Sequence, residues 1–173
     1  MLKIITEDSH DVVIDLAYAS DNNITGKAIY QDNICKLHAD AELALIKAVS
    51  IAKLSEVKIK IFDGFRPICA QEKLWQFFPD PLYVRPPSLG SNHTRGIALD
   101  ITLVDKNGIE LSMGTNFDEM SGSSHHFSNE INSLAQRNRL LLLGIMLSSG
   151  FDMIDSEWWH YELPNATKYP LYC

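Results

Sequence analysis

The sequence predicts an α+β fold in which helices pack against a small, mostly antiparallel sheet. Segments of alternating or β-branched apolar residues occur beside segments whose apolar residues recur with the period of a helix. The two kinds do not alternate regularly along the chain, as the βαβ units of a parallel sheet would require. The chain has 173 residues, 46% of them hydrophobic, and no repeat or linker-like break. We therefore expect one domain over residues 1–173 with a sizeable core.

The first part of the chain supplies two strands and a helix. Residues 12–18, VVIDLAY, combine β-branched and aromatic side chains and predict a first strand. Over residues 38–54 the apolar residues fall on one helical face, and Asp40 is placed to cap this helix. Residues 57–62, VKIKIF, alternate apolar side chains with lysine, which predicts a half-buried strand.

A turn, a second helix, a loop and a further strand follow. The sequence DGFRP at 63–67 predicts a turn, and Pro67 can open a helix over residues 68–78. Residues 79–92 hold four prolines and predict a loop. Residues 97–104, IALDITLV, have the apolar, β-branched character of a strand.

The C-terminal part predicts a long helix and then strand structure. Ser128 is placed to cap a helix that runs to about Ser148, with Gly150 at its C-terminal cap. Residues 151–163, FDMIDSEWWHYEL, are rich in aromatic side chains and predict strand structure to close the sheet.

Charge and cysteine content narrow the class of protein. A net charge of −7, with scattered lysines and arginines, argues against nucleic acid, because neutralising phosphates takes clustered cations. Cys35, Cys69 and Cys173 form no C-x-x-C pair, which favours free thiols in a reducing compartment. The N-terminus lacks the apolar segment of a signal peptide, and the longest near-apolar stretch is too short to span a bilayer. We expect a cytoplasmic protein, or a periplasmic one if a leader was removed, with no membrane or obligate protein partner.

The stretch GSNHTRGIALD, residues 90–100, is the first candidate for chemistry. His93 lies in a loop, and Asp100 lies in the strand that follows. Gly96 allows the chain to fold back between them, so the two side chains can converge on one point. A surface histidine beside a solvated aspartate is an equally good interpretation of this fragment alone. The carboxylate inside an apolar strand favours a metal, because it would be costly to bury unpaired.

The stretch SEWWHYEL is the second candidate, with Glu157 and His160 three residues apart. A neutral imidazole is a good zinc ligand, and a nearby carboxylate can take a proton from an activated water. The aromatic residues around them would exclude solvent. Taken alone, this fragment is better explained as an edge strand with aromatic core contacts.

Arg66, in the turn DGFRP, is the third candidate. An arginine there could donate hydrogen bonds to the oxyanion of a tetrahedral intermediate, although pairing with a neighbouring acid is at least as common. Taken together, the three fragments indicate a function more specifically than any one of them does. Two histidines and one carboxylate leave one position open on a zinc ion, as in a catalytic site. Glu157 and Arg66 are not needed as ligands and could serve as base and oxyanion donor, so the set as a whole is typical of metal-assisted amide hydrolysis.

The chain resembles the zinc D-alanyl-D-alanine dipeptidases, the family that includes the vancomycin-resistance dipeptidase. The pattern S-x-H-x-x-G-x-A-x-D is met in full by residues 91–100, E-x-W-H by residues 157–160 and G-F-R-P by residues 64–67. Residues 15–30 and 113–126 resemble two further family segments. The similarity covers nearly the whole chain. It implies the fold shared with zinc D-Ala-D-Ala carboxypeptidases and the hedgehog signalling domain.

The resemblance also implies a function and a set of site residues. Hydrolysis of D-Ala-D-Ala to D-alanine would use one Zn²⁺ ion, and three residues would bind it: His93, Asp100 and His160. Glu157 would be the general base and Arg66 would stabilise the transition state. Tyr18 falls at the position of the family's active-site tyrosine.

The substrate is less firmly indicated than the chemistry. Ser91, Tyr18 and Asp118 are our candidates for binding the ends of a dipeptide. Ser112 stands where the family usually has an aspartate, which we would expect to help hold the substrate's ammonium group. The alternatives are a related zinc carboxypeptidase or a peptidase of cell-wall stem peptides. A zinc-bearing binding module without turnover is disfavoured, because a structural zinc needs neither Glu157 nor Arg66.

Overall fold

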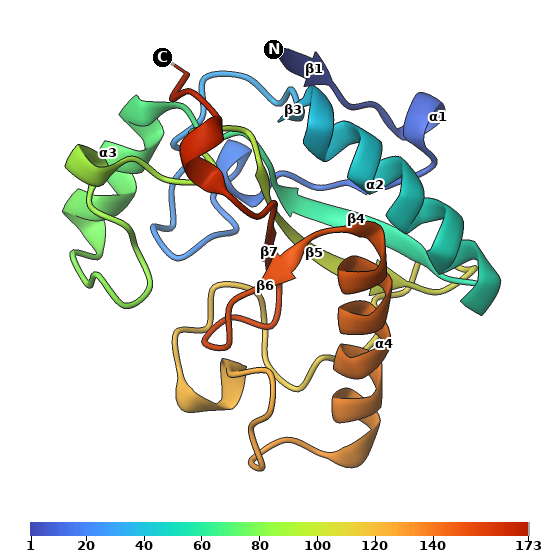
Figure 1. Ribbon diagram of the computed structural model, residues 1–173. Helices are drawn as coiled ribbons and strands as arrows, with labels where there is room; N and C mark the ends of the chain where they lie inside the picture. The colour runs from blue at the N-terminus through green and yellow to red at the C-terminus, as the bar shows by residue number, and fades with distance from the viewer. Residues whose placement is uncertain (173) are drawn as a thin grey trace.

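A computed structural model describes residues 1–172 and shows a five-stranded sheet flanked by helices (Figure 1). Within the described residues the strand order is β2-β4-β5-β7-β6, and β2–β4 is the one parallel pair of neighbours. The prediction of a mostly antiparallel α+β domain is therefore confirmed. The strands of this sheet are β2 (Val13–Ile14), β4 (Lys58–Asp63), β5 (Ala98–Val104), β6 (Asp152–Met153) and β7 (His160–Glu162).

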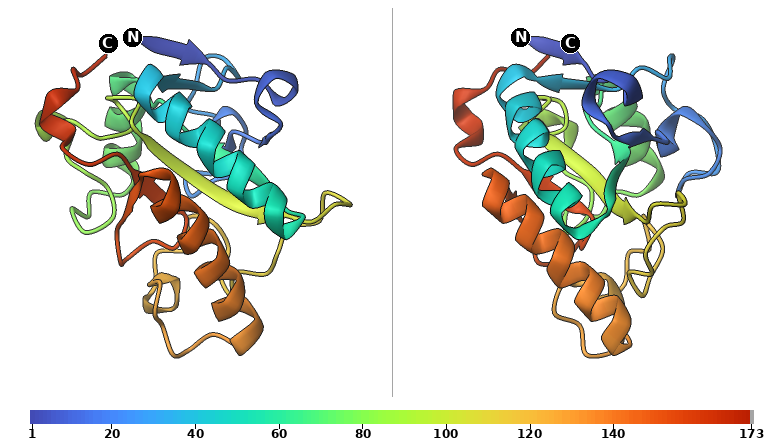
Figure 2. Two further views of the ribbon diagram at one scale, coloured as in Figure 1. Left: turned by 45° about the vertical axis from the view of Figure 1, so that its right-hand side comes forward. Right: turned by 90° about the vertical axis from the view of Figure 1, so that its right-hand side faces the viewer.

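The central strand β5 is buried along its whole length, because both faces of the sheet are covered there. On one face, Leu99, Ile101 and Leu103 join the main apolar core. The helices α2 (Ala39–Ala52) and α4 (Ser133–Ser149) lie side by side over this face (Figure 2). Since side chains alternate along a strand, Asp100 and Thr102 point to the other face. Apolar patterning thus places one carboxylate on the face away from α2 and α4.

A β-bulge brings a second carboxylate to the same face. Ile61 pairs with Ile101, but Asp63 pairs with Asp100, so β4 has one more residue than β5 between these pairs. Without the extra residue, Asp63 would follow Ile59 and Ile61 into the apolar core. The bulge instead turns Asp63 toward Asp100, near the end of the sheet where α3 (Ile68–Phe77) lies (Figure 1).

The predicted first strand, residues 12–18, is wrong in length. Strand structure covers Val13–Ile14, and residues Ala17–Ala19 form a 3₁₀ turn. Leu16, Ala17 and Tyr18 are all buried in succession, which an alternating strand cannot achieve. The turn carries Tyr18 away from the sheet edge and into the interior.

Two predicted helix caps are also wrong. His38, rather than Asp40, caps α2, and its Nδ1 accepts from the Asp40 amide at 3.2 Å. Asn132, rather than Ser128, caps α4 by accepting from the Ala135 amide at 2.9 Å. Residues 125–131 form turns before that helix begins. The predicted C-terminal cap at Gly150 is confirmed, since its φ of 107° is left-handed.

The segment 151–163 forms two short strands, β6 and β7, rather than one continuous strand. Between them the chain turns, and the amide of His160 donates to the carbonyl of Glu157 at 3.2 Å. The small sheet of β1 (Leu2–Ile4) and β3 (Lys36–His38) was not predicted, because each strand has only three residues. No helix within residues 1–172 has the length and apolar character needed to cross a bilayer.

Candidate active site

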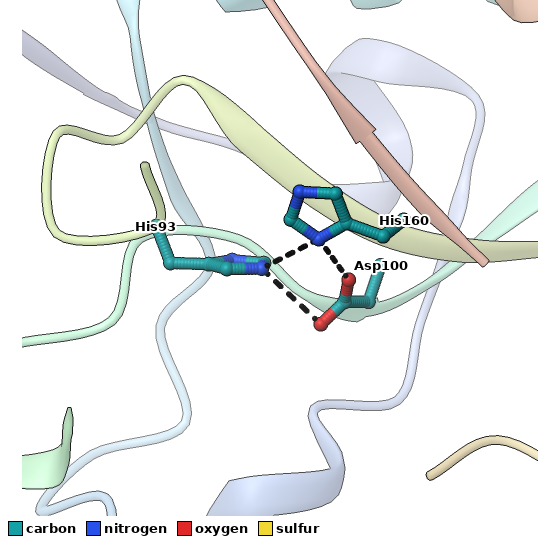
Figure 3. Close-up of side chains that lie close together, drawn as sticks. All are labelled: His93, Asp100 and His160. Atoms are coloured by element: carbon teal, nitrogen blue, oxygen red, sulfur yellow. Dashed lines mark hydrogen bonds and ion pairs between the residues drawn. The ribbon is translucent and has the colours of Figure 1, made fainter. Parts of the chain in front are cut away.

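Three side chains from separate parts of the chain meet on the face of the sheet opposite α2 and α4 (Figure 3). Asp100 lies in β5, directly opposite His160 at the start of β7, and His93 comes from the loop before β5. His160 Nδ1 lies 3.0 Å from Asp100 Oδ1, and His93 Nε2 lies 3.3 Å from Asp100 Oδ2. One ligand atom from each residue lies within 4.8 Å of the other two.

Gly96 shapes the loop that delivers His93. Its φ is +68°, and its amide donates to the carbonyl of His93 at 2.8 Å. A side chain here would be strained, and its Cβ would lie 2.6 Å from Leu2 Cδ2. The glycine therefore closes the turn that returns the chain into β5, as expected from the sequence.

The outer nitrogen of each imidazole is held by a fixed acceptor. His93 Nδ1 donates to the carbonyl of Gly64 at 2.8 Å, and His160 Nε2 donates to Glu162 Oε2 at 2.9 Å. When the rings are neutral, the inner nitrogens, His93 Nε2 and His160 Nδ1, both present lone pairs, and they lie 3.2 Å apart. Two facing lone pairs beside a carboxylate form a donor set that suits a shared cation. Such outer hydrogen bonds commonly orient metal-binding histidines.

The charges of the cluster are strongly coupled. Burial alone would raise the pKa of Asp100, but the imidazoles of His93 and His160 hold it well below its usual range. Burial would lower the pKa of His160, yet hydrogen bonds to Asp100 and Glu162 raise it to about 10. Asp100 is thus kept ionised in a buried place, as a ligand carboxylate must be.

Glu157 lies beside the cluster. Its Oε2 is 4.0 Å from His160 Nδ1, and its side chain is buried. Burial, reinforced by the charges of Asp100 and Asp118, raises the pKa of Glu157 to about 8. A carboxyl group with a pKa near neutrality can both accept and release a proton.

Arg66 reaches the cluster from the turn after β4. Its Nε and Nη2 donate to Asp63 Oδ2 at 2.9 and 2.7 Å, and Nη1 donates to Gln71 at 3.1 Å. Nη2 also lies 3.5 Å from Asp100 Oδ2. The pairing with a neighbouring acid is therefore present, and Arg66 also borders the cluster. Its role as an oxyanion donor stays a prediction.

The three predicted substrate contacts line one cavity with the cluster. The cavity has a volume of about 220 Å³, and its walls include Tyr18, Ser91 and Asp118. The Tyr18 hydroxyl donates to Asp118 at 3.0 Å, whereas Ser91 Oγ accepts from the amide of His93 at 3.1 Å. Ser112 lines a separate cavity and is not among the residues that line this one.

Asp118 has an unusual environment. It adopts a left-handed conformation with φ of 60°, a region that aspartate enters more readily than most non-glycine residues. Burial, reinforced by the charge of Asp100, raises the pKa of Asp118 to about 7. Asp118 accepts from the Tyr18 hydroxyl at 3.0 Å and lines the cavity.

Sequence reasoning missed several residues of the site. Glu162 could have been found, because a residue two positions after His160 in a strand lies on the same face. Asp63 could have been suspected from the D-x-x-R spacing to Arg66, but its face depends on the bulge. Gln71 and Tyr30, which donates to Asp63, gave no signal in the sequence.

The chain matches known proteins over nearly its whole length. A model of the M15 peptidases, described as D-Ala-D-Ala dipeptidase, matches residues 2–172. The chain is 54% identical over 161 residues to a D-alanyl-D-alanine dipeptidase of Escherichia coli (strain K12), covering 93% of this chain and 83% of that protein. It is 33% identical over 180 residues to a D-alanyl-D-alanine dipeptidase of Enterococcus faecium, covering 92% of this chain and 89% of that protein.

Proposed function

The chain belongs to the D-Ala-D-Ala dipeptidase family of M15 peptidases, and we propose that it hydrolyses D-Ala-D-Ala to two molecules of D-alanine. The single observation that carries the proposal is the convergence of His93, Asp100 and His160 in a cavity that also holds Glu157 and Arg66. An enzyme of this kind needs all five groups within reach of one peptide bond.

We assign one zinc ion to the three converging ligands. Two imidazole nitrogens and one carboxylate form a ligand set used by catalytic zinc, and they leave a coordination position free. The fixed outer hydrogen bonds of His93 and His160 support the assignment, because in the neutral rings, the form that binds a metal, they leave the inner nitrogens as acceptors. When bound, zinc polarises a carbonyl and makes a water acidic enough to act as a nucleophile near neutral pH.

Glu157 moves the proton in this proposal. Its carboxylate takes a proton from the attacking water and then gives it to the amine that leaves the cleaved peptide bond. Burial, which raises the pKa of Glu157, makes the protonated form accessible for the second step. The position of Glu157 three residues before His160 keeps the base beside the ligand cluster.

Arg66 stabilises the negative charge that develops on the carbonyl oxygen. Asp63 and Gln71 hold the guanidinium on both sides, so its orientation is fixed before the substrate binds. A preorganised donor of this kind costs no reorganisation during the reaction. The Tyr18 ring, 4.8 Å from the Arg66 guanidinium carbon, supports it from one face.

The cavity also suits a short substrate with two charged ends. Asp118 and Tyr18 would hold the ammonium group, and Ser91, which also lines the cavity, would be a hydroxyl partner for the substrate. A related carboxypeptidase or a peptidase of cell-wall stem peptides would need space for a longer acyl side. A volume of about 220 Å³ favours the dipeptide.

The test is the release of D-alanine from D-Ala-D-Ala. We expect release by the zinc-loaded protein, loss with a chelator and recovery when zinc is restored. Glu157→Gln should bind zinc and fold but lose nearly all turnover, whereas Glu72→Gln, at an exposed position of α3, should match wild type. Full turnover by Glu157→Gln would refute the base assignment, and zinc binding without any turnover by wild type would favour a binding module.

N-acetyl-D-Ala-D-Ala separates the remaining alternatives. The acetyl group removes the charge that Asp118 is proposed to bind, so a dipeptidase should cleave the acetylated substrate poorly. Equal rates on both substrates would point to a carboxypeptidase-like site instead.

We also assign the protein to the cytoplasm. Cys35 is buried and Cys69 is exposed, and both are free thiols, which suits a reducing compartment. Immunodetection in the periplasmic fraction of intact producing cells would contradict this assignment.

A further inference from the structure

The cavity of the candidate active site has an unbalanced set of charges. Four acidic side chains line it: Asp100, Asp118, Glu157 and Glu162. A dipeptide brings a carboxylate of its own, which these acids would repel. Apart from the histidines, the lining has two cationic residues, Arg66 and Arg85. These two arginines are therefore the candidates for a charged side-chain partner of the substrate's carboxylate.

Arg66 is already committed. Two of its nitrogens donate to Asp63, and a third donates to Gln71. Its Nη2 is also 3.5 Å from Asp100. The charge of Arg66 is thus compensated by a buried acid, and its remaining N–H groups are the ones proposed to stabilise the oxyanion. It is poorly suited to bind the terminal carboxylate as well.

Arg85 differs in both respects. Its side chain is exposed, and within residues 1–172 no ion pair or side-chain hydrogen bond is found for it. Its main chain, in contrast, is fixed. Gln71, which is 1% exposed, donates to the Arg85 carbonyl at 2.7 Å and accepts from Arg66 at 3.1 Å. The preceding residue, Val84, is buried in the second apolar cluster with Leu74.

The loop around Arg85 therefore combines a rigid base with a free cationic side chain. Gln71 joins this base to Arg66, so one buried side chain links the main chain at Arg85 to the guanidinium of Arg66. Ser91, at the end of the same loop, lines the same cavity. Asp118 and Tyr18 supply the acidic end, and Arg85 supplies a cationic group in the same cavity.

We propose that Arg85 binds the terminal carboxylate of the dipeptide and so selects substrates that end in a free acid. This inference rests on the proposed function and adds a specificity-determining residue to it. An arginine can bind a carboxylate through two parallel N–H···O hydrogen bonds, which are stronger than neutral ones. Together with Asp118, Arg85 would make the cavity specific for zwitterions of one length.

The test compares D-Ala-D-Ala with its C-terminal amide, which lacks the negative charge. Arg85→Gln should raise KM for D-Ala-D-Ala roughly tenfold with kcat unchanged, as expected for loss of a charge-assisted hydrogen bond. The amide is measured as a competitor of D-Ala-D-Ala hydrolysis, whether or not it is cleaved. Its inhibition constant should be the same for Arg85→Gln and wild type. Arg85→Lys should recover part of the loss.

Arg137→Gln is the matched control, because Arg137 is an exposed arginine on α4 that does not line the cavity. It should leave both constants unchanged. An unchanged KM in Arg85→Gln, or an equal change for the acid and the amide, would overturn the role of Arg85 while leaving the proposed function intact. If wild type releases no D-alanine, the proposed function fails and this inference fails with it.

Discussion

Two buried arginines, Arg66 and Arg139, have opposite kinds of partner. Arg66 is 6% exposed and is paired with the carboxylate of Asp63 beside an open cavity. Arg139, on α4, is 0% exposed and makes no contact with a carboxylate within residues 1–172. Its guanidinium donates instead to main-chain carbonyls at 2.6 to 2.9 Å, namely those of Met113, Ser123 and His125.

The partners determine how each charge behaves. Burial would lower the pKa of Arg66, but Asp63 raises it well above its usual value. Burial lowers the pKa of Arg139 to about 10, because no acid compensates for it at close range. Arg66 keeps donors free for a substrate, whereas Arg139 uses its donors to hold residues 113–125, the segment that carries Asp118. A buried charge marks a reactive site only when its partners leave part of it available.

The largest effect is expected at Arg66. Arg66→Lys keeps a cation beside Asp63 but loses the planar set of donors. We expect kcat for D-Ala-D-Ala to fall by about 10²-fold or more, the usual loss for an oxyanion donor, with little change in Tm. Steady-state kinetics and thermal unfolding of the zinc-loaded protein measure the two quantities. A large loss of Tm at unchanged kcat would make Arg66 a structural residue like Arg139.

Arg139 should show the reverse pattern. Arg139→Met leaves buried carbonyls without donors, so we expect the free energy of unfolding to fall by about 3 kcal/mol. Activity per folded molecule should fall far less than for Arg66→Lys. Urea unfolding measures the loss, and Arg137→Met, on the exposed side of the same helix, is the control. Unchanged stability with lost activity would contradict the comparison.

The sequence predicts a functional role for Arg66, but it does not predict that Arg139 is buried. Arg66 stands out because it lies in a short motif, after an apolar strand whose alternation is plain. Asp100 stands out because a carboxylate interrupts the apolar run IALDITLV. Arg139 lies in AQRNRLLLL beside Arg137, and nothing in the sequence separates the buried arginine from the exposed one. Only the packing of residues 113–125 against α4 distinguishes them.

Dependence on tertiary contacts also explains the other differences between the predicted elements and the observed ones. The helix α2 and the strands β4 and β5 follow from apolar periodicity, which is a local property. The face of Asp63 depends on a bulge between two strands, and the turn at Tyr18 depends on burial of three successive residues. The caps at His38 and Asn132 are local, but several polar residues compete for each. Tertiary contacts therefore decide what periodicity leaves open.

A smaller effect is expected at Asp118, which belongs to the segment 113–125 and lines the cavity of the candidate active site. Its pKa is raised from 3.8 to about 7 in the folded protein. Its contribution to stability is therefore fully present below pH 3.8 and is lost as pH rises through 7. Asp118→Asn should be close to wild type near pH 4 and more stable than wild type at pH 8. The measurement is Tm against pH for both metal-free proteins.

A matched comparison keeps the Asp118 prediction specific. Asp155→Asn changes an exposed aspartate for which no such gain at pH 8 is expected. An Asp118→Asn variant whose stability follows that of wild type across the whole range would show that this carboxyl is not held protonated. Its proposed contact with the substrate's ammonium would remain to be measured by KM for D-Ala-D-Ala, which should rise in the variant.

The smallest effect is expected at His126, the residue that follows the segment 113–125 and is influenced by the charge of Arg139. Burial and the charge of Arg139 lower the pKa of His126 from 6.5 to about 4. Its contribution to stability is present above pH 6.5 and is lost as pH falls through 4. His126→Phe keeps the aromatic contact with Tyr161, whose ring centre lies 5.8 Å away, but cannot take up a proton. Its Tm should therefore fall less than that of wild type between pH 6.5 and 4.

The His126 prediction also connects back to Arg139. Removing the guanidinium in Arg139→Met removes one of the two causes that lower the pKa of His126. The pKa of His126 should then lie closer to 6.5, so His126 should contribute less to the loss of stability in acid. Adding His126→Phe to Arg139→Met should therefore change the pH slope of Tm less than His126→Phe does in wild type. Equal changes in the two backgrounds would mean that burial alone lowers the pKa of His126 and that the charge of Arg139 has no effect on it.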